Sequence, residues 1–116
     1  MQAEQLKDVV INALENGKAQ DISVIDVKER TSVTDYMVLA SGTSNRHVRS
    51  VADTVVKEVK LNGVPKANIE GADASDWILV DLGDVVVHVM TTASREFYDL
   101  ERLWRDAPNL GAAGSE

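Results

Sequence analysis

Cysteine is absent from this chain of 116 residues. Its absence excludes disulfides, thiolate nucleophiles and cysteine-based zinc sites together, and it fits the reducing cytoplasm in which we expect the protein to act. Histidine occurs only at His47 and His88, and no H-x-x-x-H-type pair is present to bind a metal. We therefore expect neither a metal nor any other cofactor.

An excess of basic residues is also missing. The chain has 12 Lys and Arg residues against 19 Asp and Glu residues, which gives a formal net charge of −7. Proteins that bind nucleic acid usually carry a basic surface, because neutralising phosphates supplies much of their affinity. The charge balance therefore favours a basic protein partner over DNA, RNA or an anionic membrane.

Long apolar runs are lacking as well. No run approaches the roughly 20 residues that span a bilayer. Residues 1–8 already carry charge within a helical pattern, so neither a signal peptide nor a transit peptide is visible. The length suits one domain with a single hydrophobic core.

The most informative stretch runs from Asp76 to Met90 and reads D-W-I-L-V-D-L-G-D-V-V-V-H-V-M. Two runs rich in Val, Ile and Leu flank Gly83-Asp84, a pair that suits a two-residue type II′ hairpin turn. This register predicts one wholly aliphatic face, made of Ile78, Val80, Leu82, Val85, Val87 and Val89. The opposite face is mixed and pairs Trp77 with Met90, Leu79 with His88, and Asp81 with Val86. We therefore look for function on this mixed face.

Hydrophobic periodicity predicts the remaining elements. Helical spacing indicates a first helix that ends at Gly17, a second that ends near Asn62-Gly63, and a third from a Thr92 or Ser94 cap to about Arg105. Strands are predicted at 21–27, 35–41 and 67–71. Together with the hairpin, these give one α/β domain at residues 1–106, with a mixed sheet of about five strands and three main helices. Residues 107–116 are rich in Gly, Ala and Ser, and we expect a disordered tail there.

The last predicted helix has two distinct faces. Its spacing turns Phe97, Leu100 and either Leu103 or Trp104 inward, and it places Tyr98, Glu101 and Arg105 on another face. Its start, with Arg95, adjoins the mixed face of the hairpin.

Gly42-Thr43-Ser44 lies between a strand and a helix, where backbone N–H groups can cradle a phosphate. The turn matches neither the Walker pattern nor G-x-G-x-x-G, and capping by Thr43 or Ser44 explains it without a ligand. In nucleotidyltransferases such a turn works with two acids, two residues apart, that hold magnesium. The nearest pair here, Asp81 and Asp84, has the wrong spacing. A small nucleotidyl- or phosphoryl-transfer enzyme is therefore only the alternative interpretation.

Cations open the helix that follows this turn. Arg46, His47 and Arg49 fall in its first turns, where positive charge opposes the helix dipole, so we expect a local reason for them. On the mixed face, a packed and hydrogen-bonded histidine is the usual outcome for a mid-strand position such as His88. Trp77 and Met90 could fill a core layer or form an interface, and the residues alone leave both alternatives open.

Three blocks of the sequence closely resemble the ribosomal silencing factor family, also called RsfS or Iojap. They are T-D-Y-M-V-L-A-S-G-T-S-N-R-H-V at 34–48, D-W-I-L-V-D-L-G-D-V-V-V-H-V-M at 76–90 and S-R-E-F-Y-D-L-E-R-L-W at 94–104. The resemblance implies a nucleotidyltransferase-like fold without its catalytic acids. It also implies a non-enzymatic repressor that binds the fourteenth protein of the large ribosomal subunit, blocks subunit association and slows translation under nutrient limitation.

The resemblance itself assigns no contact residues. We infer the partner surface from positions in the matching blocks that fall on the mixed face or the last helix: Trp77, Asp81, His88, Met90, Arg95, Tyr98 and Glu101. Homodimerisation of the free protein stays open. A third interpretation, an accessory protein that binds nucleic acid, would require a stripe of basic residues. The enzyme interpretation would require a pair of acids at the spacing that holds a metal. We find neither pattern in the sequence.

Overall fold

The computed structural model describes residues 1–64, 66–71 and 76–106, with side chains as far as residue 103. Residues 72–75, between the strand predicted at 67–71 and the hairpin, and the predicted tail at 107–116 lie outside the described residues. The elements are, in chain order, α1 (Ala3–Asn16), β1 (Gln20–Asp26), β2 (Tyr36–Gly42), α2 (Asn45–Leu61), β3 (Asn68–Glu70), β4 (Trp77–Asp81), β5 (Val85–Thr91), α3 (Thr92–Tyr98) and α4 (Leu100–Asp106). The three strands predicted outside the hairpin are confirmed to within one residue at each end.

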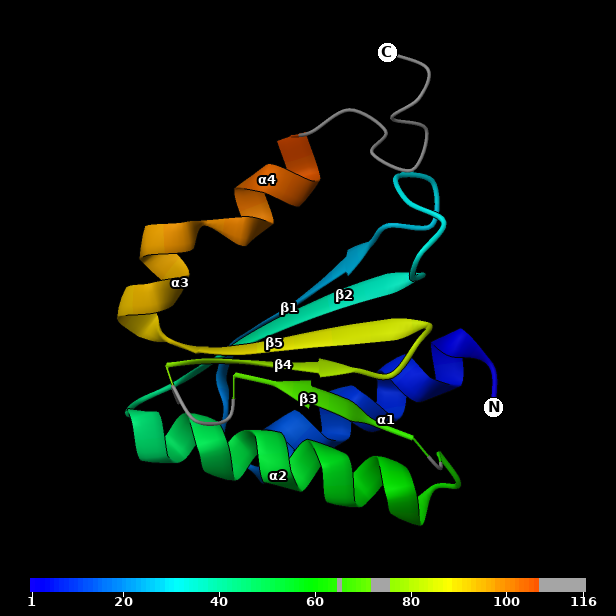
Figure 1. Cartoon of the computed structure of the whole chain (residues 1–116), viewed down its shortest axis with the longest axis horizontal. Helices are drawn as coiled ribbons and strands as arrows, with labels where there is room; N and C mark the ends of the chain where they lie inside the picture. Colours follow the sequence, from blue (N-terminus) through cyan, green and yellow to red (C-terminus); the bar gives the residue numbers. More distant parts are fainter. Residues whose placement is uncertain (65, 72–75, 107–116) are drawn as a thin grey trace.

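Within the described residues, five strands form one mixed sheet in the order β1-β2-β5-β4-β3 (Figure 1). β2 and β5 run parallel, and the other neighbouring strands run antiparallel. Every residue of β2 is buried, as its nearly continuous apolar sequence predicts for a strand inside a sheet. The mixed α/β fold predicted from the sequence is confirmed. None of the described helices combines the length and apolarity needed to cross a bilayer.

The central hairpin has the predicted register. Trp77 pairs with Met90, Leu79 with His88, and Asp81 with Val86. Gly83 has a φ of +87°, whereas Asp84 has no positive φ, which is the pattern of a type II′ turn. The two hairpin faces are therefore those expected from the sequence.

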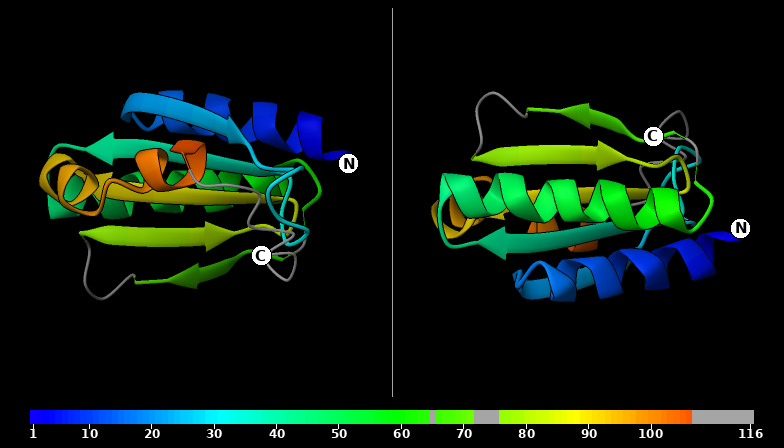
Figure 2. Two further views of the ribbon diagram at one scale, coloured as in Figure 1. Left: turned by 90° about the horizontal axis from the view of Figure 1, so that it is seen from above. Right: turned by 90° about the horizontal axis from the view of Figure 1, so that it is seen from below.

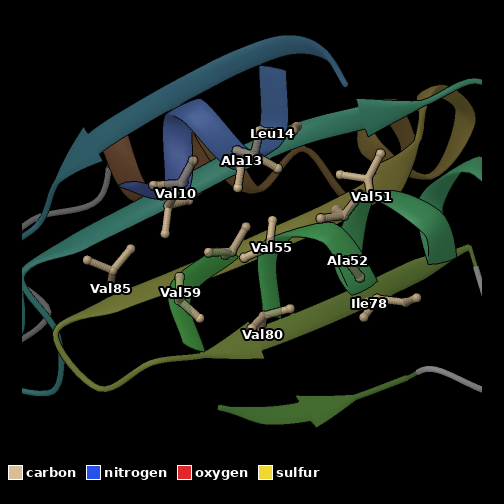
Figure 3. Close-up of a cluster of buried hydrophobic side chains, with 14 of the residues drawn as sticks. Val10, Ala13, Leu14, Val51, Ala52, Val55, Val59, Ile78, Val80 and Val85 are labelled. Atoms are coloured by element: carbon tan, nitrogen blue, oxygen red, sulfur yellow. The ribbon is translucent and has the colours of Figure 1, made fainter. Parts of the chain in front are cut away.

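One face of the sheet is covered by α1 and α2 (Figures 1 and 3). The aliphatic face of the hairpin packs there against a buried helical stripe on each helix. The two stripes contain Leu6, Val10, Ala13 and Leu14 of α1, and Val48, Val51, Ala52, Val55 and Val59 of α2. Burying side chains of this size stabilises the fold by roughly 1.5–3 kcal/mol each, so this layer is the main core.

The opposite face of the sheet carries α3 and α4 (Figures 1 and 2). A smaller core lies beneath them, formed by Ile25, Val27, Met37, Leu39 and Met90, with Trp77 and Leu100 packed against it. The mixed face is therefore partly a second core layer. Of the two alternatives left open for Met90, the structure selects the core.

The last helix differs from its prediction, because it is two short helices. α3 is capped by Thr91, whose Oγ1 accepts from the Ser94 N–H, rather than by Thr92 or Ser94. Asp99 then adopts the left-handed conformation, with φ 51° and ψ 47°, and α4 starts at the next residue.

This break corrects the predicted inward face. Phe97 is 80% exposed and was wrongly assigned to the core, whereas Leu100 packs inward as predicted. Leu103 is 54% exposed. The side chains of Trp104 and Arg105 lie outside the described residues.

Candidate partner-binding surface

Trp77 and His88 form the centre of the candidate site, at one end of the β4–β5 hairpin. The Trp77 indole N–H donates to His88 Nδ1 at 3.0 Å, and the two ring centroids lie 5.9 Å apart. An indole nitrogen can only donate, so Nδ1 must be unprotonated and the His88 proton resides on Nε2. The structure thus confirms the packed, hydrogen-bonded histidine expected from the sequence.

Burial controls the charge of His88. The residue is only 6% exposed, and this desolvation lowers the pKa of its imidazole from 6.5 to about 4. The side chain is consequently neutral near pH 7. It supports Trp77 from below rather than presenting a charge to a partner.

A line of three aromatic rings leads from this pair to solvent. The Trp77 ring lies 4.6 Å from the Tyr98 ring, and the Phe97 ring meets Tyr98 edge-on at 5.0 Å. Exposure increases along the line, from half-buried Trp77 through Tyr98 to the exposed Phe97. We call Trp77, Tyr98 and Phe97 the aromatic row. Exposed aromatic clusters of this kind are typical of interface cores rather than of free surface.

Arg95 fastens the two short helices to the sheet. Its Nε donates to Glu101 Oε1 on α4 at 2.9 Å, and its guanidinium also donates to Ser41 Oγ at the end of β2 at 2.9 Å. The Arg95 and Glu101 side chains are only 12% and 26% exposed. Both residues therefore serve the junction of α3, α4 and β2, and neither is an open surface charge.

An acid-lined cleft lies beside α3, the helix that carries Phe97 and Tyr98. It has a volume of about 290 Å³ and is lined by Asp21, Ser41, Thr92, Arg95, Glu96, Asp99 and Glu101. Four carboxylates thus surround a single guanidinium that Glu101 already engages. Glu96 and Asp99 line the cleft and directly neighbour Phe97 and Tyr98 on the chain, so α3 and its C-cap contribute to both the acidic cleft and the aromatic row.

Two predicted site residues lie apart from this surface. Met90 is fully buried beneath it, so it cannot touch a docked partner in this conformation. Asp81 lies at the far end of β4, about 13 Å along the strand from Trp77. Its Oδ1 accepts from the Gly83 N–H at 2.9 Å, which shapes the hairpin turn. The structure therefore brings together Trp77, His88 and Tyr98 by direct contact, and Arg95 with Glu101, but not Asp81.

The side chains of Ser44 and His47 bind backbone N–H groups in and near the Gly42-Thr43-Ser44 turn. Ser44 caps α2 by accepting from the His47 N–H at 3.1 Å, and the Thr43 N–H donates to His47 Nδ1 at 2.9 Å. The other ring nitrogen of His47 contacts the Gly17 carbonyl oxygen at 2.9 Å. Capping thus explains the turn, and these contacts are the local reason for a histidine in the first turn of α2.

The fold and this surface define a small mixed α/β domain that exposes aromatic and acidic side chains together. The chain belongs to the ribosomal silencing factor family, because the family model for ribosomal silencing factor during starvation matches residues 1–115. This membership, inferred above from three sequence blocks, is confirmed and associates the chain with silencing of ribosomes.

Individual relatives agree with that assignment. The ribosomal silencing factor RsfS of Chromobacterium violaceum is 42% identical over 104 residues, covering 90% of this chain and 85% of that protein. A crystal structure of a protein from the same organism superposes with a TM-score of 0.87 at 42% identity, covering 90% of this chain and 87% of that one. The mouse protein named mitochondrial assembly of ribosomal large subunit protein 1 is 42% identical over 100 residues, covering 84% of this chain but 44% of that protein.

The residue that sequence reasoning missed is Phe97. Helical spacing from Leu100 assigned it to the core, because a single helix would place the two side chains on one face. Only the left-handed Asp99 separates them. An aspartate tolerates that conformation better than most residues do, but nothing else in the local sequence marks the break.

Proposed function

We propose that the protein represses translation by binding the large ribosomal subunit through its fourteenth protein, which blocks joining of the small subunit when nutrients are short. Family membership supports the ribosomal role. The observation that carries the proposed docking surface is the exposed aromatic row beside the acidic cleft. We also propose that the protein acts in the cytoplasm.

The chemistry of this surface suits a basic protein partner. A few residues supply most of the binding energy at protein interfaces, and large aromatic side chains are frequent among them. Phe97 and Tyr98 are exposed and available to a partner. Carboxylates around them, such as Glu96 and Asp99, would steer a basic ribosomal protein and weaken binding as salt rises. The net charge of −7 acts in the same direction.

The predicted contact residues take different parts in this proposal. Trp77 and Tyr98 would touch the partner together with Phe97, whereas His88 and Met90 would hold the aromatic row from beneath. Arg95 and Glu101 would keep α3 and α4 in place. Asp81 would contact only a partner that extends along the hairpin.

We further propose that repression is steric and needs no catalysis. Two N–H groups in and next to the Gly42-Thr43-Ser44 turn are already bonded to side chains, which leaves a poor cradle for a phosphate. Asp81 is likewise engaged by the hairpin turn. Replacing Asp81 or Asp84 with Asn should leave any background nucleotide turnover unchanged, and a magnesium-dependent turnover lost in either variant would favour the enzyme instead.

Sedimentation with ribosomal particles tests the proposal. The purified protein should co-sediment with isolated large subunits and be excluded from joined ribosomes. Added before the subunits are mixed, it should reduce their joining, measured by light scattering. Equal binding to free and joined large subunits would exclude steric silencing. A large-subunit preparation lacking the fourteenth protein provides the control for the partner.

A further inference from the structure

The outer face of α2 carries a strip of basic residues. Arg46, Arg49, Lys57 and Lys60 are all exposed. At 100° per residue, their positions fall within about 80° of the helix circumference and extend over about 21 Å. One acidic residue of α2, Asp53, lies among them, so this face reverses the charge balance of the whole chain. We call these four cations the basic strip. Sequence reasoning missed it, because the cations are spread along α2 among apolar and polar residues and become one strip only on the helix surface.

A shallow groove runs along this strip. Its volume is about 340 Å³, and it is lined by Arg46, Arg49, Ser50, Asp53, Thr54 and Lys57. Three cationic side chains and two hydroxyls thus line this groove together with a single carboxylate, that of Asp53. Such cationic and hydroxyl groups donate hydrogen bonds to phosphate oxygens in nucleic-acid complexes.

The stability of α2 explains only the C-terminal end of the basic strip, where Lys60 lies in the last turn and complements the helix dipole. Cations at a helix N-terminus oppose its dipole, and the first turn of α2 contains no acidic residue to offset Arg46. Within the described residues, no ion pair holds Arg46, Lys57 or Lys60. His47 is accounted for by its contacts with Thr43 and Gly17, whereas no hydrogen bond or ion pair among the described parts of the chain accounts for Arg46.

The position of the strip selects its ligand. α2 lies beside α1 against one face of the sheet, and α3 lies on the opposite face (Figures 1 and 2). Its apolar stripe is buried in the main core, so α2 cannot insert into a lipid surface as an amphipathic helix does. A long, rigid and anionic ligand with regularly spaced phosphates fits better, and a nucleic-acid double helix has these properties.

We infer that the basic strip of α2 binds the phosphate backbone of double-helical RNA. The choice of RNA rests on the proposed function, because a protein on the large subunit is surrounded by ribosomal RNA. The aromatic row would then hold the protein partner from one side of the sheet, while α2 contacts an RNA helix from the other. Recognition would be of backbone shape and not of sequence.

Fluorescence anisotropy with an RNA duplex of about 20 base pairs tests the inference with the purified chain. If about three phosphates are neutralised, raising monovalent salt from 50 to 150 mM should weaken binding by roughly twentyfold. Arg46→Glu combined with Lys57→Glu should weaken it at least tenfold at low salt. The absence of binding at 50 mM salt would overturn the inference.

A matched control separates the strip from overall charge. Lys28→Glu with Arg102→Glu also converts two cations to anions, but away from α2, and should retain most of the affinity. Equal losses in both double variants would show a nonspecific charge effect and refute the site. Phosphatidylserine vesicles should not compete, and equal competition would refute the RNA assignment.

Failure here is distinguishable from failure of the proposed function. If the duplex does not bind but the protein still sediments with large subunits, only the basic strip is refuted. If duplex binding behaves as expected while large subunits are not bound, the proposed function fails and the strip stands. Circular dichroism of each variant establishes that α2 is still folded.

Discussion

Trp77 and His88 are joined across the hairpin by a single hydrogen bond from the indole N–H to imidazole Nδ1. This bond exists only while His88 is neutral, since a proton on Nδ1 would face the indole donor. Trp77 in turn contacts Tyr98, and Tyr98 contacts Phe97. Neutral His88 therefore holds Trp77 in position, and through Trp77 it helps to position Tyr98 and Phe97.

Acid should destabilise the protein through His88. Its pKa is about 4 when folded and 6.5 otherwise, so between these values the unfolded chain binds a proton that the native chain does not. The free energy of unfolding should therefore fall as pH drops from 6.5 towards 4. The lost stability amounts to about 3 kcal/mol. Urea denaturation at pH 7 and pH 4.5 measures most of this loss, because at pH 4.5 the native His88 is still largely unprotonated.

His88→Asn is the control for that measurement. Asparagine can keep an oxygen near the position of Nδ1 to accept from Trp77, but it does not titrate. Because Asp and Glu residues also begin to titrate near pH 4.5, the informative quantity is the difference between the two proteins. An equally steep loss in His88→Asn would show that His88 is not the responsible group.

The sequence was most informative in the hairpin, where the alternation of apolar residues and the residues of the turn predict the same strand pairing. The alternation around Gly83-Asp84 predicted the register of β4 and β5, because a slip by one residue would turn Val80 and Val87 to the other face. Met90 was harder, since a strand pattern shows which face a residue occupies but not what covers that face.

Hydrophobic periodicity could not predict the break between α3 and α4. Seven residues of α3 and seven of α4 read as one helix, and the break depends on a left-handed Asp99. Arg95 and Glu101 form the ion pair that holds the resulting bend, at a separation of six residues that a continuous helix would not favour. Phe97 was therefore misplaced, and with it the most exposed part of the site.

Phe97→Ala should reduce binding to the large subunit without reducing stability. The side chain is 80% exposed, so its truncation should change the free energy of unfolding by no more than about 0.5 kcal/mol. An anchor residue truncated in this way costs about 2 kcal/mol or more of binding, or roughly thirtyfold in affinity. Thermal melting and subunit sedimentation of one variant measure both effects.

Trp77→Ala provides the contrasting case for Phe97. Trp77 packs against the second core and donates to His88, so its removal should cost about 3 kcal/mol of stability in addition to binding. If Phe97→Ala binds normally and only Trp77→Ala fails, the partner does not use the aromatic row.

Glu101→Lys should release α4 from the sheet. The change places a second cation against Arg95, whose side chain is only 12% exposed, and should cost about 1–3 kcal/mol. Hydrogen exchange of the α4 amides should accelerate.

Glu96→Lys makes the same charge change on an exposed part of α3. It should leave the stability of the fold unchanged while weakening the binding of a basic partner. Identical exchange in the two variants would mean that the Arg95–Glu101 pair does not hold α4.

Gly42→Ala should strain the start of α2. A Cβ at this position would lie 2.7 Å from Val48 Cγ2 and 2.9 Å from the Val48 backbone nitrogen, so α2 would have to move away from β2. Overpacking of this kind costs about 1–3 kcal/mol. Gly17→Ala is the matched control, because its φ is −81° and its added Cβ would approach Val51 only to 3.4 Å. Chemical denaturation should show a clear loss for Gly42→Ala and a change below about 1 kcal/mol for Gly17→Ala. If both variants are equally stable, the contact between Gly42 and Val48 is not tight enough to require glycine in the Gly-Thr-Ser turn.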